Sequence, residues 1–176
     1  METQRNTGPD PILKKTYFVR SYEADGNRKA RLTTLCNYFQ EAAWEHAEHL
    51  SFGYTDLEEH NMLWVLSRLY VEIDSYPKWT DEILIETWPK GIDRLFALRD
   101  YVARGPGGQV YAKAGSAWLI LDETTRRPLK ADIFADLLNI VPEKSAVDYR
   151  FGKLPPLEKA DDRELRTVRH SDIDPN

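Results

Sequence analysis

The first strong pattern along the chain is a recurrence of apolar residues every three or four positions over residues 32–50. This period predicts one long amphipathic helix with a continuous apolar stripe. The stripe consists of Leu32, Leu35, Cys36, Phe39, Ala42, Ala43, His46 and Leu50. Gly53 follows as an end signal, and Thr55–Glu58 has the spacing of a capping box, which predicts one further helical turn ending near His60.

The period then changes to two, which is typical of β-strands. Over residues 63–73, alternation predicts that Leu63, Val65, Ser67, Leu69, Val71 and Ile73 share one face. Further strands are predicted over residues 14–19, 82–88, 95–103 and 110–121, the second of them stopped by Pro89-Lys90-Gly91. Four strands after one helix, joined by short connections, predict an antiparallel meander with the helix against one face, which is an α+β fold.

The two ends of the chain carry weaker patterns. Residues 1–13 combine Gly and Pro with polar residues and are expected to form a flexible lead-in. Residues 132–140 have the apolar spacing of a short helix. Residues 141–162 hold three prolines and many charges without a sustained period, so we expect an interdomain linker there, with a strand beginning again at residue 163.

Composition narrows the class of protein. Hydrophobic residues make up 41% and aromatic residues 11% of the 176 positions, which excludes a disordered chain. A net charge of -5 argues against nucleic acid as a partner, and no apolar run reaches the ~18 residues of a membrane span. The first residues lack the pattern of a signal peptide and the single Cys36 cannot form an internal disulfide, so we expect a cytoplasmic location.

Three groups of polar residues within or near the predicted helix receive structural interpretations. Glu45, His46 and His49 lie within one turn but lack the spacing of a known metal motif, so no metal and no cofactor are expected. Cys36 lies on the apolar stripe and is interpreted as a small core residue. Asp25 and Asn27 are of the residue types that cap helices and are interpreted as caps of the long helix.

A weak internal repeat relates the two ends of the chain. Residues 19–27 align with residues 168–176, with Val, Arg, Asp and Asn identical. In both copies a strand-like segment runs into an Asp-x-Asn turn. A repeat at one domain length indicates tandem duplication rather than a solenoid. We therefore expect that the chain is a fragment that stops just inside a second copy.

Several segments resemble a known family. They are Trp64-Val65-Leu66-Ser67-Arg68, Tyr76-Pro77-Lys78-Trp79-Thr80-Asp81, Thr87-Trp88-Pro89 with Arg99-Asp100, Ser116-Ala117-Trp118, and Asp122 with Thr125-Arg126-Arg127-Pro128. Together they resemble the first domain of the acyl-acyl carrier protein (acyl-ACP) thioesterases, over nearly all of residues 14–176. The resemblance implies a hot-dog fold, in which an antiparallel sheet wraps around one long helix, present twice in the whole protein. Residues 14–140 would form the first copy and residues 163–176 the incomplete opening of the second.

The resemblance also implies where catalysis takes place. In that family an Asp-x-Asn-x-His loop of the second domain is catalytic, and Asp174 and Asn176 match its first two positions. In the first copy Lys29 stands where the His belongs. A lysine is a poor general base near neutral pH unless its pKa is strongly lowered, so the first copy is expected to be non-catalytic. The chain as given is expected to have no thioesterase activity.

Binding roles follow from the same resemblance. The expected wall of an acyl tunnel between the helix and the sheet is Phe39, Ala43, Trp64, Leu66, Trp88, Phe96 and Trp118. The basic residues expected to dock an acidic carrier protein are Arg94, Arg99, Arg126, Arg127 and Lys130. The alternative interpretations are ordinary core positions for the first set and a solvated loop for the second.

The function implied is hydrolysis of the thioester of fatty acyl-ACP to free fatty acid, with this chain supplying the acyl-binding domain. Two alternatives remain open: a non-catalytic module that binds an acyl chain or a partner, and a hot-dog thioesterase that acts on acyl-CoA. An isolated first domain would expose the face that packs on the second, so a homodimer is a further possibility.

Overall fold

The structure, a computed structural model, describes residues 10–134, 139–152, 154, 164–167 and 169. Its helices are α1 (Leu32–His49) and α2 (Tyr54–Glu58), with 3-10 turns at Ser21–Glu23 and Ala131–Phe134. Its strands are β1 (Leu13–Phe18), β2 (Met62–Ile73), β3 (Glu82–Asp93), β4 (Phe96–Arg104), β5 (Val110–Asp122) and β6 (Pro128–Leu129). The long helix, the short second helix and the strands predicted between residues 14 and 121 are therefore confirmed. The strand predicted to begin at residue 163 is not: its described residues, 164–167, form no strand. Of the helix predicted over residues 132–140, the 3-10 turn covers only the beginning, and residues 135–138 lie outside the described residues.

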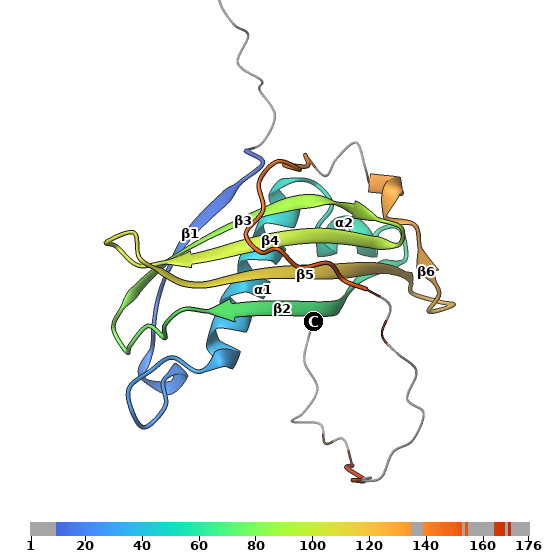
Figure 1. Ribbon diagram of the computed structural model, residues 1–176. Helices are drawn as coiled ribbons and strands as arrows, with labels where there is room; N and C mark the ends of the chain where they lie inside the picture. Colours follow the sequence, from blue (N-terminus) through green and yellow to red (C-terminus); the bar gives the residue numbers. More distant parts are fainter. Residues whose placement is uncertain (1–9, 135–138, 153, 155–163, 168, 170–176) are drawn as a thin grey trace, which may run out of the picture.

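All strand pairs are antiparallel, in the order β1-β3-β4-β5-β2, with β6 paired to β5. The sheet curves around α1, which lies across one face (Figure 1). The prediction of a simple meander is wrong for β2. Only β3, β4 and β5 follow one another as neighbours, whereas β2 pairs with β5 at one edge and β1 pairs with β3 at the other.

The described sheet has three register shifts, and the two described next change what the sequence pattern predicts. The β2–β5 register shifts between Leu66 and Arg68, so that Ser67 is an extra residue. Because a bulge reverses the alternation, Trp64 faces the helix side together with Leu69. Strict alternation over residues 63–73 would have placed the two on opposite faces. The second shift lies between Pro89 and Gly91, where β3 was predicted to stop. The strand instead continues to Asp93, since a bulge accommodates the missing N–H of proline.

The main core lies between α1 and the inner face of the sheet. Leu35, Phe39 and Ala42 of the helix are buried against strand residues that include Ile85 and Tyr101. The Phe39 and Tyr101 rings lie 5.1 Å apart between centroids. At one end of the helix this core gives way to smaller clusters around Phe52 and Leu57. The cavity described below opens among them.

The described part of the predicted linker packs on the outer face of the sheet, opposite α1 (Figure 1). Val147 is buried there, and the Tyr149 ring stacks on Tyr70 at 4.1 Å between centroids. The Trp88 indole N–H donates to the backbone oxygen of Lys144 at 3.0 Å. Residues 139–152 thus form an irregular strap that covers this face, and they contain no helix or strand.

The Asp-x-Asn turn that precedes α1 does not cap the helix. The Asp25 carboxylate accepts from the backbone N–H groups of Lys29 and Asn27, which closes the loop on itself. These bonds hold the pKa of Asp25 below its usual value, the bond from Lys29 contributing most. The residue before the helix is Arg31, and its side chain makes no capping bond. The capping interpretation of Asp25 and Asn27 is therefore wrong, because the loop itself uses the carboxylate.

Candidate functional site

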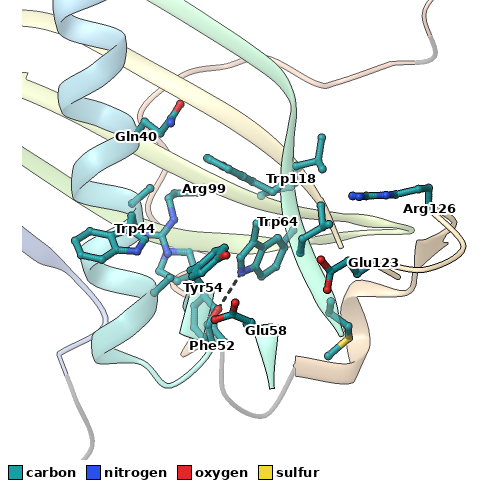
Figure 2. Close-up of a pocket in the computed structure, with 18 residues that line it drawn as sticks. Gln40, Trp44, Phe52, Tyr54, Glu58, Trp64, Arg99, Trp118, Glu123 and Arg126 are labelled. Atoms are coloured by element: carbon teal, nitrogen blue, oxygen red, sulfur yellow. Dashed lines mark hydrogen bonds between the residues drawn. The ribbon is translucent and has the colours of Figure 1, made fainter. Parts of the chain in front are cut away.

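A cavity of about 500 Å³ lies between α1, α2 and the inner face of the sheet (Figure 2). Its lining residues are Gln40, Ala43, Trp44, Ala47, Phe52, Tyr54, Glu58, Met62, Leu63, Trp64, Val65, Pro89, Ala97, Leu98, Arg99, Trp118, Glu123 and Arg126. The volume is within the usual range for a site that binds a small molecule. Space exists beside the helix because Ala43 and Ala47, one turn apart, present only methyl groups to the sheet.

Aromatic residues form much of the wall and are held in fixed orientations. The Trp64 indole N–H donates to the backbone oxygen of Phe52 at 2.9 Å, and the two rings meet edge to face. The Trp118 indole N–H donates to Ser116 Oγ at 2.8 Å. Each indole therefore satisfies its polar group outside the cavity and turns apolar surface toward it.

One charged group lies at the buried side of the cavity. Arg99 on β4 is only 6% exposed, and its Nη1 donates to His46 Nδ1 at 2.9 Å and to Thr87 Oγ1 at 3.2 Å. Because arginine has no acceptor, His46 Nδ1 accepts and the ring proton is on Nε2, which donates to the Asp10 backbone oxygen at 3.1 Å. Burial and the neighbouring Arg99 charge lower the pKa of His46 to about 4, so its ring is neutral at pH 7.

The mouth of the cavity is formed by partly exposed residues. Trp44 and Tyr54 are 48% and 54% exposed, and both lie on the helical side. Glu123 and Arg126 lie on the opposite side, in the turn after β5 (Figure 2). The cavity therefore opens to solvent between aromatic and charged rims, while Arg99 lies at its buried floor.

The seven residues predicted to line an acyl tunnel fall into two groups. Ala43, Trp64 and Trp118 line the cavity. Phe39 is buried in the main core, Trp88 is buried on the outer face beneath the strap, and Leu66 and Phe96 are half-buried away from the cavity. The structure thus brings together one position from each of α1, β2 and β5.

The five basic residues predicted to dock a carrier protein also separate. Arg94, Arg126, Arg127 and Lys130 are exposed, near the end of the sheet where the β3–β4 turn and β6 lie (Figure 1). Arg99 is buried in the cavity and presents no surface to a protein partner. Strand alternation carried the signal for this placement, because Arg99 shares its face with the buried Ala97 and Tyr101.

Other lining residues were not predicted as functional. Trp44 falls outside the apolar stripe of α1, and Phe52 and Tyr54 lie in and after the short link between the helices. Their signal in the sequence is weak, since a large aromatic residue next to a helix end has many possible contacts. The Ala43–Ala47 pair is the clearer sign, because two small residues one turn apart leave room at a helix surface.

The predicted catalytic residues Asp174 and Asn176 lie outside the described residues. Within the part of the chain that the structure describes, no three His, Cys, Asp or Glu side chains gather as metal ligands. In that same part, no helix is both long and apolar enough to cross a membrane. Cys36 is partly buried, and burial raises the pKa of its thiol, which fits a packing role.

Comparison with known proteins gives consistent matches. The sequence profile of the acyl-ACP thioesterase N-terminal domain matches residues 11–140. The chain is 31% identical to oleoyl-acyl carrier protein thioesterase 1 of Arabidopsis thaliana chloroplasts, over 82% of this chain and 44% of that protein. It is 27% identical to the chloroplast palmitoyl-acyl carrier protein thioesterase of the same plant, over 89% of this chain and 38% of that protein.

A solved structure agrees with these matches. The acyl-ACP thioesterase from Bacteroides thetaiotaomicron superposes with a TM-score of 0.68 at 27% identity, over 93% of this chain and 66% of that one. The predicted hot-dog fold is thereby confirmed. The chain spans less than half the length of the two curated Arabidopsis relatives. Its profile match, which covers most of the described residues, shows that the chain belongs to the acyl-ACP thioesterase family, as an N-terminal domain of that family.

Proposed function

We propose that this chain supplies the acyl-binding domain of an enzyme that hydrolyses the thioester of fatty acyl-ACP and releases free fatty acid. The observation that carries the proposal is the cavity of about 500 Å³ in a domain of this family. Its apolar wall suits a hydrocarbon chain, because each buried methylene group contributes about 0.8 kcal/mol. Ala43, Trp64 and Trp118 are the predicted tunnel residues that line it and are proposed to contact the chain.

The catalytic step is proposed to use groups beyond the described residues. By resemblance, Asp174 and Asn176 belong to the loop that orients a general base or the attacking water. Within the described copy, the equivalent loop has its Asp25 carboxylate bound to its own backbone and carries the exposed Lys29. That loop contains no histidine, which supports a binding role for the first domain.

Carrier docking is proposed at the exposed basic residues near the cavity mouth, which are Arg94, Arg126, Arg127 and Lys130. Arg126 both lines the mouth and belongs to this group. A positive patch there would guide an acidic carrier protein and bring its acyl chain to the opening. Arg99 is not proposed for docking, because it is buried.

Calorimetric titration of the 176-residue chain with dodecanoyl-ACP tests the binding role. We expect saturable binding that is at least tenfold weaker with carrier protein lacking the acyl chain. Ala43→Trp should fill the cavity and abolish this acyl-dependent difference, whereas Thr33→Trp, on an exposed position of the same helix, should preserve it. Equal binding of loaded and unloaded carrier would contradict the proposal.

Docking has its own test with single charge reversals. Arg126→Glu should weaken binding of both loaded and unloaded carrier, more at low salt than at high salt. Arg150→Glu makes the same charge change at an exposed position of the outer strap and should have little effect. Equal loss in the two variants would indicate a general charge effect rather than a docking surface.

Two further measurements test the turnover and the assembly of this chain. Release of dodecanoic acid by the chain itself, above the buffer rate, would contradict the assignment of catalysis to the second domain. Sedimentation tests the predicted homodimer, which a clean monomer would exclude.

The cytoplasmic location likewise stays a prediction, since the two plant relatives named above are chloroplast proteins.

A further inference from the structure

Arg99 is a buried cation whose charge has no carboxylate partner among the described residues. Among the residues that the structure describes, its side chain donates through Nη1 alone, to His46 and Thr87, and both acceptors are neutral. Arginine carries five N–H donors, so Nε–H and the two Nη2–H groups have no protein acceptor within the described part of the chain. The burial of an unpaired charge is costly, and such a group calls for a ligand.

The position of Arg99 indicates where that ligand would bind. Arg99 lines the cavity and, at 6% exposed, is far more buried than the mouth residue Trp44, at 48% (Figure 2). Its Nε–H and Nη2–H groups form the planar fork that binds a carboxylate through two parallel hydrogen bonds. The donors therefore open into a cavity rather than into the packed core.

The lining of the rest of the cavity indicates which chemical group the ligand must have besides its anionic head. Ala47, Phe52, Trp64 and Trp118 are apolar and line the same cavity as Arg99. A small inorganic anion would leave this surface without contacts, whereas a long alkyl chain would cover it. The complementary ligand has one carboxylate and one hydrocarbon tail.

We propose that the cavity binds an unesterified fatty acid, with its carboxylate on Arg99 at the floor and its tail extending toward the mouth. A thioester-linked chain that enters from the mouth would bring its methyl end to Arg99 and leave the cation unpaired. The site therefore favours free acid over esterified acyl chains. This deepens the proposed function, since free acid is the product of that reaction, but binding itself needs no hydrolysis.

Calorimetric titration with dodecanoic acid and with 1-dodecanol, both below their aggregation concentrations at pH 8, tests the proposal. The two ligands share a tail and differ in the head group. We expect the acid to bind the wild-type chain at least tenfold more tightly. Arg99→Met should abolish this preference while retaining binding of the alcohol. Arg150→Met, on the outer face, should leave the preference unchanged.

A measurement on the wild-type chain keeps the proposal testable if Arg99→Met does not fold. The carboxyl carbon of ¹³C-labelled dodecanoic acid reports its ionisation by NMR. Contact with a buried guanidinium should lower the pKa of the bound acid relative to free acid. Equal affinity for acid and alcohol, an unshifted carboxyl pKa or no binding of either ligand would overturn the proposal. Acyl-dependent binding of loaded carrier would still stand in those cases, because it does not need Arg99.

Discussion

On the two faces of β4, neighbouring charged residues are buried in different surroundings. Asp100, 2% exposed, points to the outer face, where Oδ2 accepts from the Ala146 backbone N–H at 2.7 Å and from Lys90 Nζ at 3.0 Å. Arg99 points to the inner face, where its hydrogen-bond partners are a neutral His46 and the Thr87 hydroxyl. Consecutive residues of one strand thus bury an anion with a counter-ion and a cation that has none within the described part of the chain.

This difference distinguishes a charge that is used to hold the fold together from one that remains free to bind a ligand. Asp100 fixes the strap to the sheet, since its carboxylate binds both the strap backbone and the bulge residue Lys90. Arg99 makes no such connection between elements through a charged partner in the described residues. A buried ion that is fully paired stabilises the fold, whereas one that faces a cavity is available to a ligand.

The largest expected effect is a contrast in stability between these neighbours. Asp100→Ala should lower the free energy of unfolding by about 3 kcal/mol, because it leaves Lys90 and the Ala146 N–H without their partner. Arg99→Met should lower it by only about 1 kcal/mol, since removal of an unpaired buried charge offsets the loss of the hydrogen bonds to His46 and Thr87. Urea denaturation of both variants measures the contrast. Equal losses would mean that both charges serve the fold.

Lowering the pH should reduce the stability of the fold through protonation of His46 on the inner face. The folded-state pKa of about 4 lies below the ordinary value of 6.5, so the unfolded chain binds the proton more readily between these pH values. The contribution of the neutral ring is complete above pH 6.5 and is lost as the pH falls through 4, by about 2–3 kcal/mol.

Chemical denaturation from pH 7 to pH 4 checks this dependence. His46→Gln keeps an acceptor for Arg99 but cannot be protonated, so its profile should be flatter than that of the wild type. His60→Gln, at an exposed position, should follow the wild-type profile. A His46→Gln profile that matches the wild type would assign the acid sensitivity to carboxylates elsewhere.

The fold could be predicted from the sequence where one period extends over a whole element. The 3.6-residue stripe of α1 and the alternation in β2 were sufficient to predict that these two elements exist. The two bulges were not predictable in this way, because the extra residue at Ser67 has no distinctive chemistry and Pro89-Gly91 resembles a strand end. Strand order was missed for a related reason: the β2–β5 pairing is a long-range contact that local patterns do not encode.

The site was less predictable than the fold. Ala43, Trp64 and Trp118 were found through the family resemblance, and they line the cavity. Trp88 was predicted beside them, but its position along β3 places it on the outer face. Arg99 was assigned to a surface because it is basic, although the burial of its strand face predicts otherwise. The sequence pattern predicts which face of a strand a residue lies on. Whether a cavity forms depends on which small side chains lie opposite each other in the folded chain.

A methyl group on the outer face should have a moderate effect. A Cβ at Gly115 would lie 3.0 Å from Val147 Cγ2 and 3.3 Å from Asp100 Oδ1, so Gly115→Ala must displace the strap. We expect a loss of about 1–2 kcal/mol in the free energy of unfolding. Gly91→Ala is the matched control in the same sheet, since its Cβ would meet nothing within 4 Å. Similar small losses in both variants would show that the strap does not press on the sheet.

The smallest effect on stability is expected at the mouth of the inner face. Trp44 is 48% exposed, so Trp44→Ala should change the free energy of unfolding by no more than about 0.5 kcal/mol. The same variant should weaken binding of dodecanoic acid several-fold, because the ring lines the cavity that would receive the ligand. Trp79→Ala removes a similarly exposed indole at a position outside the cavity lining and should leave that affinity unchanged. A large loss of stability in Trp44→Ala would make the mouth part of the core, and the inner face would then resemble the outer one.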